Sequence, residues 1–267
     1  MVDTKPADTT NDHQNLQTPS PEHYRFLSKV RRRRITISWI RVGIVIFIIA
    51  LWELSARFGW VNSFITSSPA RVWNMVVSMV RSGELWVHLG WTTAETVAGF
   101  TLGTAIGIIV AIFLWWSDFV SRVVEPYIVI LQSIPKVALG PIFIVWLGTN
   151  VDAIIAMALA ISVIVTILMV HTGFREVDPN KIKLLKTFGA TKWQILRLVV
   201  LPASIPTMIG ALKVNVGLSM VGVITGEFLV SKAGLGYLIV YGGQVFNMTL
   251  VMSGVIILCI LSALLYY

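Results

Sequence analysis

The sequence predicts an all-α membrane protein, a six-span helical bundle with both termini in the cytoplasm. Hydrophobic residues make up 56% of the 267 residues and charged residues only 13%, whereas soluble globular chains carry about 25% charge. With a mean hydropathy of +0.80 and a mass of 29.6 kDa, a soluble chain could not bury so much apolar surface in one core. Six apolar segments each approach the roughly 20 residues that a helix needs to cross a bilayer. They cover residues 35–56, 92–116, 123–147, 153–170, 203–230 and 248–267.

The amino-terminal 28 residues differ from everything that follows. Residues 1–28 are polar and contain three prolines, so they cannot bury enough apolar surface to offset the entropy of ordering, and we predict a disordered cytoplasmic tail. Residues 29–267 then form one transmembrane domain. A basic cluster, Lys29 and Arg31–Arg34, directly precedes the first apolar segment. Such a cluster at a span boundary is typical of a topogenic anchor rather than a nucleic-acid patch.

The distribution of charge decides the orientation. If the amino terminus is inside, most of the 21 lysines and arginines fall on inside segments, as the positive-inside rule requires. The net charge of +8 is therefore interpreted as topology, and no nucleic-acid partner is expected. The chain stops within the last apolar segment without a basic flank, so we expect either a few further residues or a very short inside end.

The predicted cytoplasmic loop, residues 174–202, carries the most information. Asp178-Pro179 begins a helix, because Asp caps free amide groups and Pro fits the first helical position. Gly189 ends this helix, and Thr191 can cap a second one that ends at Leu201-Pro202. We predict a hairpin of two helices around a glycine turn; an amphipathic loop against the lipid headgroups is the alternative. The apolar sides comprise Ile182, Leu185 and Phe188 in the first helix, and Trp193, Ile195, Leu196, Val199 and Val200 in the second.

The same loop resembles the EAA loop of ABC importer permeases, whose pattern ends in Gly, a nine-residue spacer and Ile/Val-x-Leu-Pro. Here Gly189 is followed, after nine residues, by Val199-Val200-Leu201-Pro202. Other landmarks, spread over roughly residues 35–267, resemble the nitrate/sulfonate/taurine-type branch of this binding-protein-dependent family. They are Ser68-Pro69, Ser82-Gly83-Glu84-Leu85-Trp86, Ile134-Pro135, Val145-Trp146-Leu147-Gly148, Val177-Asp178-Pro179 and Gly234-Leu235-Gly236-Tyr237.

This resemblance implies the permease subunit of an ATP-driven importer in the bacterial cytoplasmic (inner) membrane. The expected cargo is a small, anionic solute such as nitrate, a sulfonate, taurine, bicarbonate, an aromatic acid or a vitamin precursor. The implied partners are an ABC ATPase dimer that holds ATP and Mg²⁺, a second permease copy (identical or a close paralogue), an extracytoplasmic substrate-binding protein and the lipid bilayer.

The resemblance also assigns the hairpin to ATPase coupling. One departure is that Lys183-Leu184-Leu185 stands where the family has Glu-Ala-Ala, so we expect an acidic ATPase surface opposite Lys183. The residues assigned to coupling are Lys183, Leu184, Leu185, Phe188, Gly189, Ala190, Thr191, Trp193, Leu201 and Pro202.

Motifs for catalysis are missing from the sequence. No Gly-x4-Gly-Lys-Ser/Thr loop occurs, so ATP binding of the P-loop kind is not expected. The four histidines lack metal-ligand spacing, the single cysteine excludes an internal disulfide, and no nucleophile and base are paired. We therefore expect no enzymatic activity, catalytic residue, metal or cofactor in this chain.

Candidates for a translocation path lie in the third and fifth segments. Pro135 should bend the third segment, and Lys136 at mid-depth would cost about 2.5–3.5 kcal/mol in lipid, so it should face the bundle or a cavity. It either pairs with Glu227 or attracts an anionic substrate. Lys213, near the inner end of the fifth segment, faces a similar choice, with snorkelling favoured. The path candidates are Gln132, Ser133, Pro135, Lys136, Asn215, Ser219 and Glu227.

Glycines recur every four residues in two segments, and such small residues let helices approach closely. We interpret Gly99, Gly103 and Gly107 as packing residues, and Gly222 and Gly226 as neighbours of a central path. A self-sufficient secondary transporter or channel is the alternative function. Such proteins often carry inverted repeats with paired broken helices, whereas here only the third segment is broken.

Overall fold

The structure, a computed structural model, describes residues 21–266 and divides into two units, residues up to Phe58 and from Gly59 onward. The first unit holds α1 (Pro21–Arg57), whose part Ile35–Arg57 is long and apolar enough to cross a membrane. Helix α1 begins at Pro21, a residue that fits the first turn of a helix. Residues 21–28 are therefore helical rather than part of the predicted tail, and residues 1–20 of that tail lie outside the described residues.

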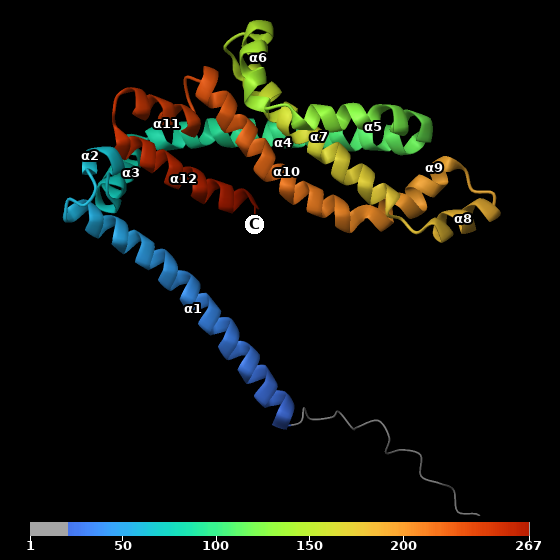
Figure 1. Cartoon of the computed structure of the whole chain (residues 1–267), viewed down its shortest axis with the longest axis horizontal. Helices are drawn as coiled ribbons and strands as arrows, with labels where there is room; N and C mark the ends of the chain where they lie inside the picture. Colours follow the sequence, from blue (N-terminus) through green and yellow to red (C-terminus); the bar gives the residue numbers. More distant parts are fainter. Residues whose placement is uncertain (1–20, 267) are drawn as a thin grey trace, which may run out of the picture. The chain divides into compact units, whose positions relative to one another are not determined.

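In the described residues of the second unit, all regular secondary structure is helical (Figure 1). Its elements are α2 (Ser63–Thr66), α3 (Pro69–Ser82), α4 (Glu84–Trp116), α5 (Asp118–Ser133), η1 (Lys136–Leu139), α6 (Gly140–Leu147), α7 (Val151–Arg175), α8 (Pro179–Thr187), α9 (Lys192–Ile195), η2 (Leu196–Val200), α10 (Leu201–Val230), α11 (Leu235–Gln244) and α12 (Met248–Tyr266).

Within residues 21–266, five helical segments are long and apolar enough to span a membrane, and a sixth crossing is added if α5 and the η1–α6 segment count as one bent span. The predicted bend at Pro135 is in fact a break of 91°. Ile134 and Pro135 have extended backbone, because a proline disfavours helical conformation in the residue before it and has no N–H for a helical hydrogen bond. The third span is thus two helices rather than one bent helix.

Helix α7 packs most extensively against α10 and α4. The packing role predicted for the α4 glycines is confirmed: a Cβ at Gly99 would lie 2.7 Å from Cβ of Ala158, and one at Gly107 would lie 2.6 Å from Cβ of Thr166. Gly103 faces Ser162 in the same row. Because the row on α7 also repeats every four residues, the two helices meet along one stripe of small side chains.

The glycines of α10 pack closely against another face of α7. A Cβ at Gly226 would lie 2.8 Å from Cα of Ile154, and Gly222 faces the backbone of Ala158. Gly222 and Gly226, which are predicted from the sequence to lie near a central path, are thus used for close packing inside the subunit.

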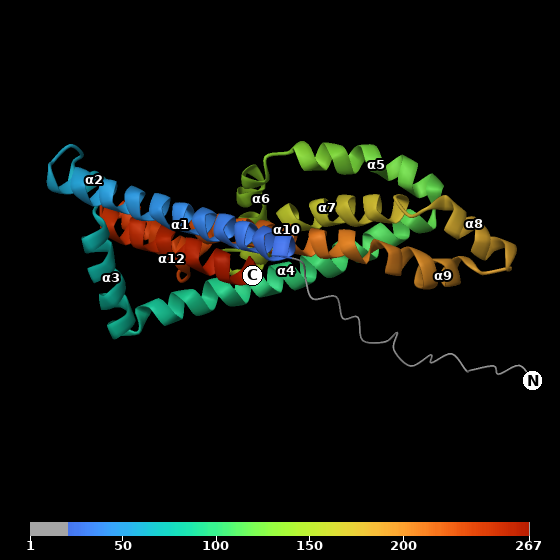
Figure 2. The same ribbon diagram turned by 90° about the horizontal axis from the view of Figure 1, so that it is seen from below.

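The second unit has two ends formed by different helices (Figure 1). Figure 1 and Figure 2 show α8 and α9 at one end of the bundle and α3 and α11 at the other. At the α3 end, Met79, Leu235, Leu238 and Leu250 form a buried apolar cluster that ties α3, α11 and α12 together.

Candidate functional site

The hairpin between α7 and α10 has the predicted helix, turn and helix arrangement. Asp178 caps α8, since its Oδ1 accepts a hydrogen bond of 2.8 Å from the amide of Asn180. Gly189 adopts φ +74° at the turn, a conformation that residues with a Cβ resist. Thr191 and Gln194 then form a reciprocal capping box at the start of α9, with the Thr191 amide donating to Gln194 Oε1 at 2.7 Å. The two caps and the glycine turn predicted from the sequence are thus all present.

The second hairpin helix does not end at Leu201-Pro202, contrary to the prediction. Residues Leu196–Val200 form a π-helical turn, η2, and the amide of Leu201 donates to the carbonyl of Leu196. The chain then continues directly into α10. Pro202 cannot donate an amide hydrogen bond, and a π turn is one way in which a helix absorbs such an irregularity without stopping. The hairpin is therefore joined to a membrane helix by continuous helical backbone.

The inner face of the hairpin is fixed to the bundle. Ile195, Leu196 and Val200 are buried together with Phe174 of α7, and Ile182 and Leu185 of α8 are partly buried against the same cluster. These positions confirm most of the predicted apolar sides. A displacement of the hairpin must therefore carry α7 and α10 with it.

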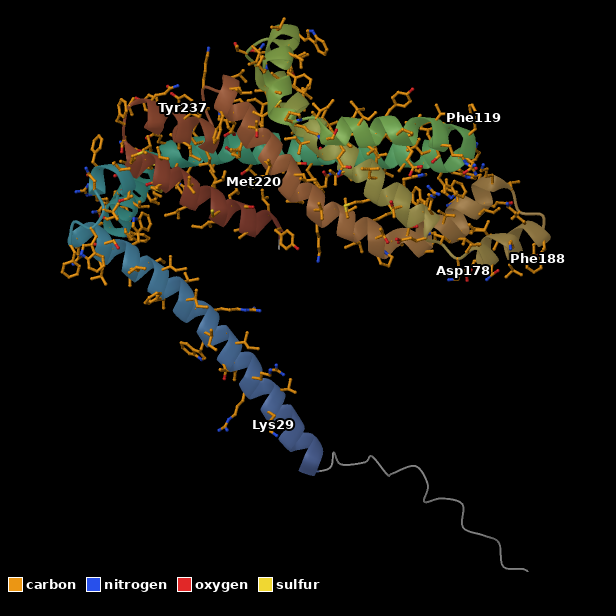
Figure 3. The ribbon with its side chains drawn as sticks, in the orientation of Figure 1. Lys29, Phe119, Asp178, Phe188, Met220 and Tyr237 are labelled. Atoms are coloured by element: carbon orange, nitrogen blue, oxygen red, sulfur yellow. The ribbon has the colours of Figure 1, made fainter. Side chains whose placement is uncertain are left out.

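An apolar outer hairpin face, made of Leu184, Phe188 and Trp193, is exposed. Their exposed fractions are 55%, 80% and 56%, and Figure 3 shows Phe188 at the tip of the hairpin. Phe188 and Trp193, predicted on the apolar sides of the two hairpin helices, therefore do not share the buried or partly buried positions of Ile182, Leu185 and Ile195. Phe188 falls at the carboxyl end of α8, where the glycine turn redirects the chain, and Trp193 instead lies beside Trp116, with ring centroids 6.5 Å apart.

The other coupling candidates are distributed over the same hairpin. Ala190 and Leu201 are half-buried, whereas Lys183, Gly189, Thr191 and Pro202 are exposed. Lys183 also lines a cavity against α5 and α7, and no pattern in the sequence predicts this position.

The path candidates fall into two separate places. Gln132, Ser133 and Pro135 are exposed at the break between α5 and η1, and Lys136 Nζ donates to the carbonyl of Gln132. In contrast, Asn215, Ser219 and Glu227 are buried inside the subunit, where Asn215 Nδ2 donates to Thr104 Oγ1 of α4 at 2.6 Å.

The pairing of Lys136 with Glu227 is not formed, because Glu227 has other partners. Only 1% exposed, it accepts hydrogen bonds from Thr92 Oγ1 at 2.7 Å and from the amide of Gly236 at 2.5 Å. Thr92 Oγ1 in turn accepts from the amide of Leu235 at 2.8 Å, and His88 Nδ1 accepts from the amide of Gly234 at 3.0 Å. Side chains of α4 and α10 thus cap the amino terminus of α11.

This cap explains one of the sequence landmarks. Gly234 has φ +113°, and a Cβ at Gly234 or Gly236 would collide with the Glu227 carboxylate. The glycines in Gly234-Leu235-Gly236-Tyr237 therefore let the backbone of α11 approach Glu227.

A cavity of about 690 Å³ lies between α10 and α12. Gly217, Val221 and Thr225 line it from α10, and Ser262 and Tyr266 from α12. Sequence reasoning missed this face because it selected polar residues. Two positions along a helix correspond to about 200° of rotation, so the buried row Asn215, Ser219 turns away from the row Gly217, Val221. Lys213 is exposed one turn before Gly217, on the cavity face.

The helical bundle, its bent third element and the hairpin continuous with α10 together define a multi-pass membrane permease. The chain belongs to the family described as the binding-protein-dependent transport system inner membrane component, which matches residues 103–267.

Relatives and solved structures agree with this assignment. The chain is 28% identical over 192 residues to the formylaminopyrimidine transport permease protein ThiX of Halalkalibacterium halodurans, covering 72% of this chain and 76% of that protein. It is 22% identical over 241 residues to the taurine transport system permease protein TauC of Escherichia coli, covering 87% and 86%. An inward-facing structure of the MetNI methionine ABC transporter is similar with a TM-score of 0.59 and 25% identity, over 65% of this chain and 87% of that one.

The chain is therefore a binding-protein-dependent ABC importer permease of the nitrate/sulfonate/taurine branch. This assignment favours the importer over the self-sufficient transporter or channel that the sequence left as an alternative.

Proposed function

We propose that this permease acts as a pair in the bacterial cytoplasmic membrane, with an ATPase dimer at the hairpin end and an external binding protein at the α3 and α11 end. The observation that carries the proposal is the outer hairpin face. Three large apolar side chains, Leu184, Phe188 and Trp193, stand exposed on an element whose other face is fixed to the bundle. Exposed apolar groups rimmed by polar residues mark protein interaction sites. ATP and Mg²⁺ bind on the ATPase in this proposal, and this chain holds no catalytic group.

Movement of the ATPase would reach the membrane through the hairpin. Because Ile195, Leu196 and Val200 are buried against α7, the hairpin cannot tilt without shifting its neighbours. The continuous backbone from α9 through η2 extends the same movement into α10. Rigid-body shifts of packed helices are a common means of switching between two states.

The proposed cargo is a small anionic solute, and the proposed path includes the cavity between α10 and α12. Exposed Lys213 lies on the cavity face of α10, where its charge would attract an anion. Gln132, Ser133, Pro135 and Lys136, at the exposed break, are retained as path candidates on the same argument. Asn215, Ser219 and Glu227 are assigned a supporting role because they are buried within one subunit.

Co-purification with candidate ATPases tests the docking proposal. We expect a wild-type complex, and we expect Phe188→Ser to remove it while the permease remains folded. Phe119→Ser is the matched control, because Phe119 is 76% exposed, close to the 80% of Phe188, but belongs to α5 (Figure 3). Equal complex formation by both variants contradicts docking at the outer hairpin face. Uptake by the permease alone in liposomes would contradict the dependence on an ATPase.

A further inference from the structure

Another cavity, which is polar and has a volume of about 370 Å³, lies at the hairpin end between α4, α5, α7 and α8. It is separate from the outer hairpin face and from the cavity between α10 and α12. Its polar lining consists of Asp118, Ser121, His171, Arg175, Lys183 and Lys186.

The lining carries an excess of positive charge. Asp118 pairs with Arg122 at 2.8 Å, and Arg175 lies 3.5 Å from Glu125. Among the side chains that the structure describes, none forms an ion pair with Lys183 or Lys186. With the ion pairs cancelled, two ammonium groups on one side of α8 remain without a counter-charge, which is the arrangement that attracts an anion.

The cavity also has a fixed polar wall. Ser121 and His171 are both more than nine-tenths buried, and Ser121 Oγ is 2.9 Å from His171 Nε2. This hydrogen bond joins α5 to α7, so the wall is held by two membrane helices. The polar wall and the two lysines line the same cavity and offer it both hydrogen bonding and charge, whereas genuinely empty cavities in proteins are apolar.

The surroundings place the cavity at a membrane–water boundary. Trp115, Trp116 and Trp193 gather at this end, and tryptophans are enriched at the level of the lipid headgroups. Beside the cavity, α5 exposes Phe119 and Val123, apolar side chains that an acyl chain can cover. Basic pockets between transmembrane helices on the cytoplasmic side are known settings for anionic headgroups.

We propose that this cavity binds the phosphate group of an anionic phospholipid, with Lys183 and Lys186 neutralising its charge and the Ser121–His171 wall supporting it. A soluble phosphate has the same chemistry, and the experiment below separates the two sources. Lys183 stands where the family has a glutamate. In this proposal it binds a lipid phosphate beside its own subunit, rather than the acidic ATPase surface expected from the sequence. Lipid bound here would hold α8 against α5 and α7.

Native mass spectrometry and thermal unfolding of the purified full chain test the site. The probes are short-chain phosphatidylglycerol, phosphatidylcholine and inorganic phosphate, each titrated separately. We expect phosphatidylglycerol to bind and stabilise the chain more than phosphatidylcholine does. The double variant Lys183→Gln/Lys186→Gln should weaken this binding by about 25-fold, or about five-fold per lysine near an anionic surface. The matched control, Lys181→Gln/Arg197→Gln, removes two exposed charges from the same hairpin that do not line the cavity.

Four results are decisive. Selective loss of phosphatidylglycerol binding in the Lys183→Gln/Lys186→Gln variant supports the site. If the variant loses inorganic phosphate binding to the same extent, the anion site is supported but is assigned to soluble phosphate. Equal phosphatidylglycerol binding by the wild type and both double variants overturns the proposal. Unchanged lipid binding together with loss of the ATPase complex would also overturn it, since the lysines would then serve the partner.

Discussion

Thr92 donates a 2.7 Å hydrogen bond to Glu227 across 135 residues of sequence, and the same threonine oxygen accepts the amide of Leu235. Through this one side chain α4, α10 and α11 meet in the interior. Glu227 accepts from both Thr92 and Gly236, so its two carboxylate oxygens are used as acceptors.

Replacing the carboxylate with an amide should destabilise this junction. In Glu227→Gln, one of the two positions becomes a donor and faces the Thr92 hydroxyl or the Gly236 amide. A buried donor or acceptor left without a partner costs about 1–3 kcal/mol. We expect thermal unfolding in detergent to occur at a lower temperature for Glu227→Gln. Lys213→Gln, an exposed change on the same helix, is the control. An unfolding midpoint equal to that of the wild type would contradict the capping role of Glu227.

The glycine row of α4 predicts opposite effects for two alanine substitutions. In Gly107→Ala the new methyl group would lie 2.6 Å from Cβ of Thr166, and we expect the overpacking to destabilise the chain by about 1–3 kcal/mol. In Gly90→Ala, on the same helix, nothing lies within 4 Å, so alanine should stabilise by about 0.5–1 kcal/mol through its better helix propensity. Denaturant unfolding of both variants tests the pair. Equal effects would show that the close α4–α7 approach is not required.

Substitutions at Gly189, in the turn of the hairpin, distinguish the effect of backbone strain from the effect of side-chain size. Gly189 has φ +74° and open space around it, so Gly189→Ala should cost about 1–2 kcal/mol in hairpin stability without blocking the outer face. Gly189→Asn should cost less, because Asn tolerates this conformation better. Gly189→Arg adds a bulky charge and should also weaken ATPase association. Hydrogen exchange over residues 179–200, followed by co-purification, distinguishes the three. Slower exchange in Gly189→Ala than in the wild type would contradict the strain.

The position of Lys213 predicts a charge effect on uptake. With a reconstituted importer, Lys213→Gln should raise the KM for an anionic substrate such as taurine or nitrate, because the attraction at the cavity face is lost. Lys213→Arg retains the charge and should behave nearly as the wild type. The effect should shrink at high ionic strength, where charges are screened. Equal KM values for all three proteins would show that Lys213 only snorkels to the membrane surface.

The sequence predicted the features that depend on neighbouring residues. The caps at Asp178 and Thr191, the turn at Gly189 and the close packing at Gly99 and Gly107 follow from local chemistry and helical spacing, and the structure has all of them. Contacts between residues far apart in the sequence could not be predicted in this way. Nothing near Glu227 in the sequence indicates that a helix beginning at Leu235 would be capped by it.

Two differences between the sequence-based expectations and the structure have clear physical causes. Polar residues of α10 were expected in a path because polar groups in membrane helices often mark function. Asn215 instead donates a hydrogen bond to Thr104 within the subunit, and the cavity lies on the apolar face behind it. The sequence predicts that a helix ends at Leu201-Pro202, but the backbone continues through a π turn into α10, an irregularity that residue types alone do not reveal.

The irregular turn η2 also has a mechanical consequence. The helical segment from Lys192 to Val230 is 39 residues long, which at 1.5 Å per residue corresponds to about 60 Å. Its irregularities, η2, Pro202 and Pro206, all lie in the part next to the hairpin. The pivot of this rod is therefore expected near the cytoplasmic end, with residues 207–230 swinging as one stiff arm. Glu227 lies at the end of that arm farthest from the pivot. A small tilt at the pivot would therefore cause a larger displacement at the start of α11.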